Sequence, residues 1–370
     1  MSASESATVQ EARRIMEICN ACRYCGGFCA VFPAMEKRRS FSRGELEYLA
    51  NLCHNCTSCF HACQYAPPQE FDLNCPKVMA ELRAETYEKY VWPDFLGRVF
   101  HGNGLVVSLL SAAVVAAVLA LTLVLRGPAR VLGLHQGAGA FYRVIPYGWM
   151  LAVPAVLCLF ALMALAIGVL RFARGMEGEL RLLLRPGNLL VAVRDVLVLR
   201  YLGGGGDGCN DEDETFSHLR RWLHQSVFYG FLLCLVSTTT AACYDHVLGL
   251  PAPYGPFSLP VATGTIGGLG LVCGTAGLLW FKLKRAAEPA AQRLTGMDVA
   301  FTTQLFLTSL TGLILFALRG TSAMGVLLAV HLGFVAALFL CLPYSKFVHA
   351  LYRFVALVRF AAEGPYKNEP

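Results

Sequence analysis

The chain has few charged side chains. Asp, Glu, Lys and Arg make up 15% of its 370 residues and apolar residues make up 56%, whereas soluble proteins average about 25% and 45–50%. This balance excludes a disordered chain and an ordinary soluble protein, and it indicates a membrane protein with a soluble part. The first 95 residues carry 10 Lys and Arg against 12 Asp and Glu, so no basic block indicates a nucleic-acid partner.

Two common signals are also missing. Residues 1–17 are polar and contain no apolar stretch of the kind found in a secretory signal. No Cys-x-x-Cys-His motif for covalent haem attachment occurs in the chain. We therefore expect the N-terminal cysteines to lie in a reducing cytoplasm, where thiols bind metals rather than form disulfides.

Six long apolar stretches predict transmembrane helices. Each has about 20 or more residues, enough to cross roughly 30 Å of hydrocarbon. None contains Asp, Glu, Lys or Arg, which argues against an ion-coupled transporter. The predicted spans are 104–125, 144–170, 222–244, 257–281, 299–318 and 320–345.

The basic residues outside these spans predict the orientation. With the N-terminus inside, sixteen Lys and Arg fall in the inner loops and the C-terminal tail, and only Arg126, Arg130, Arg143 and Arg319 fall on the outer side. The positive-inside rule then places both termini in the cytoplasm, as expected for a multi-pass protein of a bacterial-type inner membrane. The arginine-rich segment 176–202 is either an amphipathic helix on the inner membrane surface or a linker packed on the bundle.

A glycine-rich segment precedes the third predicted span. Gly203, Gly205 and Gly208 have the spacing of a dinucleotide-binding fingerprint, but no βαβ pattern surrounds them. The acidic run at 207–214 would repel a pyrophosphate. We interpret the segment as a flexible acidic turn rather than a nucleotide site.

Nine of the fifteen cysteines lie between Cys19 and Cys75. Eight of them form two runs with the spacing C-x2-C-x2-C-x3-C, which is typical of bacterial [4Fe–4S] ligands. In two-cluster ferredoxins the fourth cysteine of each run binds the other cluster. We therefore assign cluster 1 to Cys19, Cys22, Cys25 and Cys63. We assign cluster 2 to Cys53, Cys56, Cys59 and Cys29.

These cysteines have other possible roles. Structural zinc uses two pairs of ligands more often than two runs of four, and disulfides do not suit a reducing compartment. Cys75 precedes Pro76 and is a second candidate for the ligand position assigned to Cys63. Alternatively, Cys75 is a buried thiol where a helix begins, with Pro76 at the first helical position. The expected fold is all-α, with a helical two-cluster ferredoxin-like domain at 1–95, a six-span domain at 96–355 and a cytoplasmic tail at 356–370.

Histidines at membrane depth are candidate ligands of haem b, which needs two axial ligands. His224 lies at the cytoplasmic end of the third span and His349 just after the sixth, so the two lie at similar depth on different helices. We predict that this pair binds a haem. His331 lies 18 residues before His349, which is about five helical turns and roughly 27 Å along one face. It is a candidate for a second haem or an alternative partner.

Four other histidines are weaker candidates. His246 and His101 flank predicted spans and were considered as haem ligands. His54 and His61 lie beside the cluster cysteines, where they tune the clusters by hydrogen bonding or face solvent. No catalytic residue is predicted.

The whole chain resembles the tricarballylate-utilisation protein B family, also called citrate-utilisation protein B. The resemblance rests on the two cysteine runs and on the segments 201–209, 228–231, 251–254 and 343–349. The sixth span is also similar to the haem b subunit of respiratory nitrate reductase, in which the histidines matching His331 and His349 serve different haems. In that subunit an earlier helix supplies two partner histidines about ten residues apart. Here His224 matches the first of these histidines, but Cys234 stands at the position of the second. The number of haems therefore stays open.

The resemblance implies an electron-transfer subunit rather than a stand-alone catalyst. Such proteins reoxidise a soluble flavoprotein dehydrogenase and pass electrons through two [4Fe–4S] clusters and haem b to quinone; no flavin is expected on this chain. Two alternatives stay open. One is the reductase arm of an oxygenase-type flavoprotein, as in cobalamin-related relatives, and the other is a membrane redox sensor or transporter.

Overall fold

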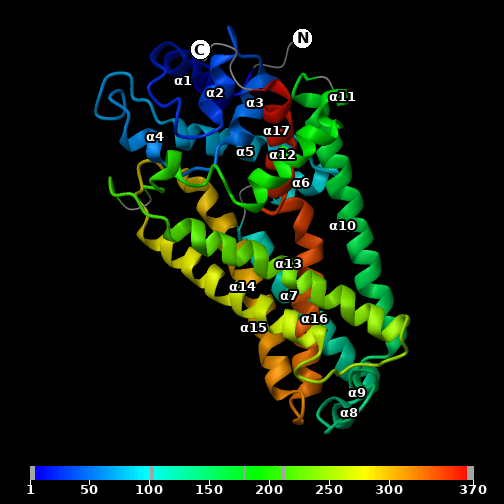
Figure 1. The fold of residues 1–370 in the computed structure, drawn as a ribbon. Coiled ribbons are helices and arrows are strands. Elements are labelled where there is room, and N and C mark those ends of the chain that lie inside the picture. Colours follow the sequence, from blue (N-terminus) through cyan, green and yellow to red (C-terminus); the bar gives the residue numbers. More distant parts are fainter. Residues whose placement is uncertain (1–4, 101–103, 179, 211–212, 365–370) are drawn as a thin grey trace.

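The computed structural model describes residues 5–100, 104–178, 180–210 and 213–364. These residues form helices and loops without a β-strand, and their isolated backbone bridge joins Cys209 to Ser217. The predicted all-α class is therefore confirmed. Figure 1 shows short helices gathered at one end of the molecule and long helices extending away from them.

The N-terminal part consists of short helices joined by the cysteine-containing loops. Ser6 and Ser42 begin two of these helices by accepting hydrogen bonds from the amides of Val9 and Glu45, as N-cap residues do. The helices are α1 (Ala7–Cys22), α2 (Val31–Glu36), α3 (Arg43–Leu52), α4 (Ser58–His61), α5 (Cys75–Tyr90) and α6 (Asp94–Phe100).

Within the described residues, six helices are long and apolar enough to cross a membrane, as predicted. They are α7 (Gly104–Arg126), α10 (Tyr147–Gly175), α13 (Leu219–His246), α14 (Leu259–Lys284), α15 (Thr295–Leu318) and α16 (Met324–Cys341). The shorter elements between and after them are α8 (Pro128–Val131), α9 (Ala140–Val144), α11 (Leu180–Leu183), α12 (Pro186–Leu197), η1 (Gly204–Gly206), η2 (Gln292–Leu294), η3 (Leu342–Tyr344) and α17 (Val348–Glu363).

Small residues bring α13 and α14 together into a close hairpin, which is inclined to the other long helices in Figure 1. A Cβ on Gly230 of α13 would lie 2.8 Å from the Gly267 carbonyl oxygen, and one on Gly274 would lie 2.8 Å from the Leu223 carbonyl oxygen. Close backbone approach through glycine is a common way of packing helices in a bilayer, where no hydrophobic effect drives association.

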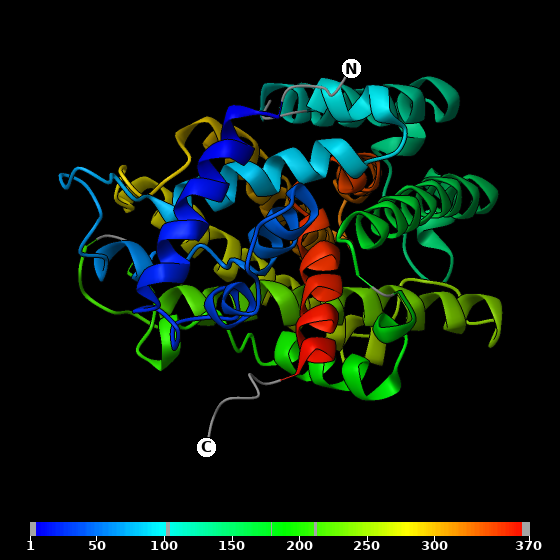
Figure 2. The same ribbon diagram turned by 90° about the horizontal axis from the view of Figure 1, so that it is seen from above.

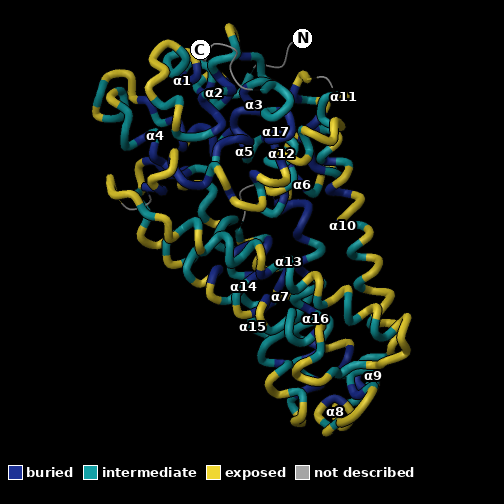
Figure 3. The backbone as a smooth tube through the Cα atoms, in the orientation of Figure 1, coloured by how far each residue is buried: buried dark blue, intermediate teal, exposed yellow. Residues whose placement is uncertain are grey.

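The N-terminal helices share one core with the membrane half. Phe172 of α10 stacks on Tyr352 of α17 at 4.6 Å between ring centroids, and Tyr90 of α5 packs edge-on against Phe172. Figure 2 shows α17 beside α3, and Figure 3 shows the buried backbone concentrated around α3, α5 and α17. The stability of the N-terminal domain therefore comes from packing against α10 and α17 as well as from its own small core.

The C-terminal helix α17 is fastened to the N-terminal helices by ion pairs. Arg38 bonds both Glu45 and Glu363, at 2.6 Å for the Glu363 pair. Arg359 is 3.0 Å from Glu363 and forms a second pair with Glu45. The segment expected as a free tail thus includes the second half of a packed helix.

The arginine-rich segment after α10 forms α11 and α12. Pro186 occupies the start of α12, where its missing amide proton costs nothing. Ala192 and Asp195 are buried against α17, whereas Leu184 and Leu190 are 75% and 69% exposed. The segment therefore combines one face packed on the protein with an exposed apolar face.

Candidate functional site

The four thiols assigned to cluster 1 line a single cavity of about 200 Å³. Arg23, with a left-handed φ of 56°, ends α1 between Cys22 and Cys25 and turns the chain so that both side chains face this cavity. Cys63 approaches from the second run, after α4. Cys22 is exposed, so this cavity reaches the surface of the protein.

The fourth thiol of the first run lies among the thiols of the second. Cys29 interacts electrostatically with Cys56, Cys53 and Cys59. Asn55 and Thr57 have left-handed φ values of 56° and 61°, which turn the second run around this group. Cys59 also interacts electrostatically with Cys19 and Cys25, so the two groups of thiols adjoin. The exchange of the fourth ligand between the two runs stays a prediction.

Cys75 lies between the two groups of thiols. It is the first residue of α5, with Pro76 following and the Asn74 side chain capping the helix by accepting from the Lys77 amide. Its side chain is hydrogen-bonded to that of Cys59, and it does not line the cluster-1 cavity, which Cys63 does. This arrangement favours Cys63 over Cys75 as a ligand.

Burial changes the acidity of these thiols. It raises the pKa of Cys29 well above the usual thiol range and raises the pKa of Cys25 to about 12. A contact with the Cys209 side chain lowers the pKa of Cys56 to about 6, helped by Ser58 and Arg220 and opposed by burial. Since only thiolates ligate metals, binding of iron must displace protons from the buried thiols.

The thiols fit iron–sulfur clusters better than a single ion. In the part of the chain that the structure describes, no three His, Cys, Asp or Glu side chains converge on one metal position. Eight cysteines in two groups of four are the ligand complement of two cubanes. The residues present therefore suit two [4Fe–4S] clusters.

The predicted haem ligands lie next to one another. The ring centroids of His224 on α13 and His349 on α17 are 6.1 Å apart, and the rings are perpendicular. A metal–imidazole bond is about 2.0–2.1 Å long, so two imidazoles on opposite sides of one metal ion have centroids roughly 6 Å apart. The spacing is compatible with a bis-histidine haem, and the same distance also occurs between rings in direct edge-on contact, such as Tyr201 and Phe360 at 5.9 Å. The haem assignment stays a prediction.

The hydrogen bonds of the pair also suit metal ligation. His349 Nδ1 bonds the Lys346 carbonyl, which leaves Nε2 free, and a ligating histidine usually makes such a bond. Burial lowers the pKa of His349 well below its usual range and so keeps the ring neutral. His224 Nδ1 is buried and has no hydrogen-bond partner in the described structure. An unpartnered buried nitrogen indicates a missing group at this place.

The helix that carries His349 also contacts the second cysteine run. One turn after His349, Arg353 donates from Nη2 to the Cys53 carbonyl at 2.7 Å and from Nε to the Asn51 carbonyl at 3.3 Å. Arg83 of α5 donates to the same Cys53 carbonyl. The cluster-2 thiols and the histidine pair are thus joined through a single helical turn.

His331 occupies a different environment. Its Nδ1 lies 3.2 Å from the Thr311 hydroxyl on α15, and a Cβ on Gly312 would be 3.0 Å from its ring. The expectation that His331 and His349 lie on one continuous helix is wrong, because α16 ends at Cys341 and α17 begins at Val348. Pro343 in η3 accounts for the break, since proline cannot continue the helical hydrogen bonds.

The remaining histidines lie elsewhere. His246 ends α13 far along the chain from His224 and bonds the Tyr147 hydroxyl at 2.5 Å. His54 Nδ1 is 2.9 Å from the Leu52 carbonyl, and His61 packs edge-on against Phe60. His101 lies outside the described residues.

Three charged residues meet where α14, α15 and η3 approach the N-terminal domain. Asp298 in the first turn of α15 bonds Lys282 at 3.1 Å and also bonds Lys346. The predicted fifth span began at residue 299 and so left Asp298 out. The sequence contained one signal for this charged cluster. It was a single acidic residue where an apolar helix begins, together with lysines at the ends of two other apolar stretches.

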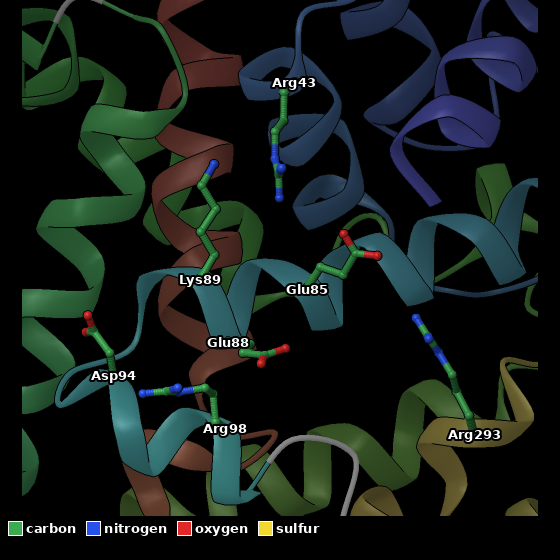
Figure 4. A pocket seen from close by; sticks show the side chains of 7 residues that line it. All are labelled: Arg43, Glu85, Glu88, Lys89, Asp94, Arg98 and Arg293. Carbon is green, nitrogen blue, oxygen red and sulfur yellow. The ribbon is translucent and has the colours of Figure 1, made fainter. Parts of the chain in front are cut away.

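A larger charged cavity does not belong to this site. It has a volume of about 480 Å³ and is lined by four basic and three acidic side chains from α3, α5, α6 and η2, which Figure 4 shows arranged around a common space. None of its lining residues is a cysteine or a histidine. Arg43 and Lys89 are already paired with Glu47, at 2.8 Å each.

Fold and site together define a membrane protein with a ferredoxin-type N-terminal domain. Residues 12–89 match the family described as citrate utilization protein B Fer4-like domain, and residues 101–368 match the family described as citrate utilization protein B. The chain is 47% identical over 360 residues to citrate utilization protein B of Escherichia coli, covering 95% of this chain and 92% of that protein. No solved structure matches the chain. The chain therefore belongs to the citrate utilization protein B family, and the predicted resemblance is confirmed.

Proposed function

We propose that this chain is the electron-transfer subunit for a soluble flavoprotein dehydrogenase of the tricarballylate or citrate-utilisation type. It takes electrons from that partner and delivers them, through two [4Fe–4S] clusters and one haem b, to quinone in the membrane. Membership of the citrate utilization protein B family supports the metabolic setting. The organic substrate is oxidised by the partner, so this chain needs no catalytic residue of its own.

The observation that carries the proposal is the order of the three groups of ligands. The cluster-1 thiols open to the surface beside Tyr24, whose side chain is 70% exposed. Among the cluster-2 thiols, Cys53 and Cys56 are buried, and Arg353 connects Cys53 to the helix that bears His349. A soluble donor can therefore approach cluster 1, and cluster 2 lies toward the membrane.

The residues that would hold each group follow from this geometry. Cluster 1 would be held by Cys19, Cys22, Cys25 and Cys63. Cluster 2 would be held by Cys29, Cys53, Cys56 and Cys59. Haem b would be held by His224 and His349. When bound, these groups accept and release single electrons, and the protein supplies their ligands, spacing and low-dielectric surroundings.

The same arrangement supports an orientation in a bacterial-type inner membrane. We propose that residues 1–95 and α17 lie in the cytoplasm, where a soluble dehydrogenase can reach them. The six spans then cross the bilayer with Asp298, Lys282 and Lys346 at its inner boundary. The excess of arginine and lysine on this side agrees with the positive-inside rule.

Optical spectra of the purified protein test the haem assignment. Dithionite reduction should produce a b-type band in the unsubstituted protein and in His331→Ala, because His331 is hydrogen-bonded to Thr311 instead. The band should be lost in both His224→Ala and His349→Ala. Absence of the band from the unsubstituted protein, with its iron–sulfur signals intact, would remove haem from the proposal.

The acceptor needs a separate experiment. Protein reduced anaerobically should be reoxidised by a soluble quinone analogue within the mixing time, without oxygen. Reoxidation that occurs only after oxygen is admitted would instead favour the reductase arm of an oxygenase-type flavoprotein.

A further inference from the structure

The membrane half contributes one more thiol to the neighbourhood of the cysteine runs. Cys209, in the loop before α13, is 0% exposed and packs in a small apolar cluster with Cys56, Leu199 and Leu202. Its side chain is hydrogen-bonded to that of Cys56. The other cysteines beyond residue 75 all lie within the membrane-spanning helices, so Cys209 is the one cysteine of this half of the chain beside the assigned cluster ligands.

Main-chain contacts fasten the loop around Cys209 to the second cysteine run. The Asn210 amide donates to the Cys56 carbonyl at 3.1 Å, and the Ser58 hydroxyl donates to the Gly208 carbonyl at 3.3 Å. Cys209 and Ser217 exchange two amide-to-carbonyl hydrogen bonds of 2.9 Å each. These bonds fix the backbone on both sides of Cys209 and therefore the position of its thiol.

Glycine permits this close approach. Gly208 has a φ of +124°, and a Cβ there would lie 2.7 Å from the Ser217 carbonyl oxygen. Gly204 also has a positive φ, of +50°, and a Cβ on it would collide with the Ser58 hydroxyl. Side chains other than glycine are disfavoured in both conformations. The glycine run that was discounted as a nucleotide site therefore seats this loop on the thiols.

The chemistry of the contact sets its direction. A cysteine that ligates iron has lost its proton, so Cys209 must be the donor and the Cys56 sulfur the acceptor. Hydrogen bonds to ligand sulfurs tune the potential of iron–sulfur clusters. A donor stabilises the reduced state more than the oxidised state, because the added electron makes the sulfur more negative.

We propose that Cys209 is a positioning residue that donates its S–H to the Cys56 sulfur and thereby raises the reduction potential of cluster 2. The inference rests on the proposed function, since it takes Cys56 as a cluster ligand. A higher potential at cluster 2 favours the movement of electrons inward from the exposed cluster 1.

The test is a potentiometric titration of the purified full-length protein, followed by electron paramagnetic resonance. The cluster-2 signal is assigned as the one that changes in Cys56→Ser. Cys209→Ala should retain the full iron content, but its ratio of reduced to oxidised cluster 2 at a fixed ambient potential should fall about three- to tenfold. That change corresponds to roughly 30–60 mV at 59 mV per tenfold for one electron.

Two further variants separate the hydrogen bond from packing. Cys209→Ser keeps a donor and should restore most of the potential. Leu202→Ala removes apolar packing from the same small cluster but no donor, and it should leave the potential unchanged.

An unchanged cluster-2 potential in Cys209→Ala overturns the proposal. Loss of cluster-2 iron from Cys209→Ala also overturns it, because Cys209 would then be a ligand and not a donor. If the unsubstituted protein holds no pair of [4Fe–4S] clusters, the proposed function fails first. The iron content of the unsubstituted protein therefore distinguishes the two failures.

Discussion

Asp298 is the side chain whose neutralisation should most disturb the junction between the cluster domain and the membrane bundle. It accepts from Lys282 at 3.1 Å and from Lys346, and it is only 15% exposed. Asp298→Asn keeps the size of the side chain and removes its charge. Two lysines are then left facing each other without a counter-charge.

The magnitude follows from the burial of the three groups. Removing one partner of a buried ion pair costs about 3–5 kcal/mol, because the remaining charge is uncompensated. Lys282 is 14% exposed, but Lys346 is 37% exposed and can be hydrated in part. We therefore expect the lower end of the range, about 3 kcal/mol. The Lys346 carbonyl accepts from His349, so this proposed haem ligand should loosen as well.

The assay is denaturant unfolding of the detergent-solubilised protein, followed by far-ultraviolet circular dichroism and by the haem absorption band. Asp298→Asn should lose its haem band at lower denaturant than its helices, whereas the parent loses both together. Asp213→Asn, at an exposed residue that bonds Thr215, is the matched control and should change stability by less than about 0.5 kcal/mol. Adding Lys346→Met to Asp298→Asn should recover part of the loss. An Asp298→Asn protein as stable as the parent would refute the reasoning.

Three other perturbations test separate parts of the site. Cys63→Ser should lose the cluster-1 resonance signal and its iron, whereas Cys75→Ser should keep both clusters. The reason is that Cys63, and not Cys75, lines the cluster-1 cavity. The opposite pattern would exchange the roles of the two cysteines. Arg353→Met removes donors to the Cys53 carbonyl and should lower the unfolding free energy by about 1.5–3 kcal/mol, and an unchanged denaturation midpoint would contradict this. Oxidative removal of iron should increase hydrogen exchange at 23–30 and 53–63 but not in the helices packed on α17, so a uniform increase along the N-terminal domain would disagree.

Much of the fold could be predicted from the sequence, because its strongest signals are local. Long apolar runs identify all six spans, and their length is set by the thickness of the bilayer. The errors arose at the ends of helices. A charged residue such as Asp298 ends the apolar run that is used to predict a span, even where the helix itself continues past that residue. Pro343 marked the break between α16 and α17, but the apolar run across it concealed the change of helix.

The candidate cluster thiols could be predicted because the members of each run lie close in sequence. Two cysteine runs with regular spacing indicate the thiols directly, and equal depth in the membrane indicates the pairing of His224 with His349. Cys209 and Arg353 could not be recognised in the same way. Cys209 meets Cys56 across 153 residues, and Arg353 donates to a backbone carbonyl, an acceptor that every residue carries. Only the packing of α17 and the glycine-rich loop brings these residues to the cluster ligands.

The most direct test of the account is metal and haem analysis of anaerobically purified protein, combined with electron paramagnetic resonance of the reduced sample. The account predicts two [4Fe–4S] clusters and one b-type haem for each chain, with loss of the haem when His224 or His349 is replaced. Protein that contains zinc or eight free thiols in place of the clusters would contradict it.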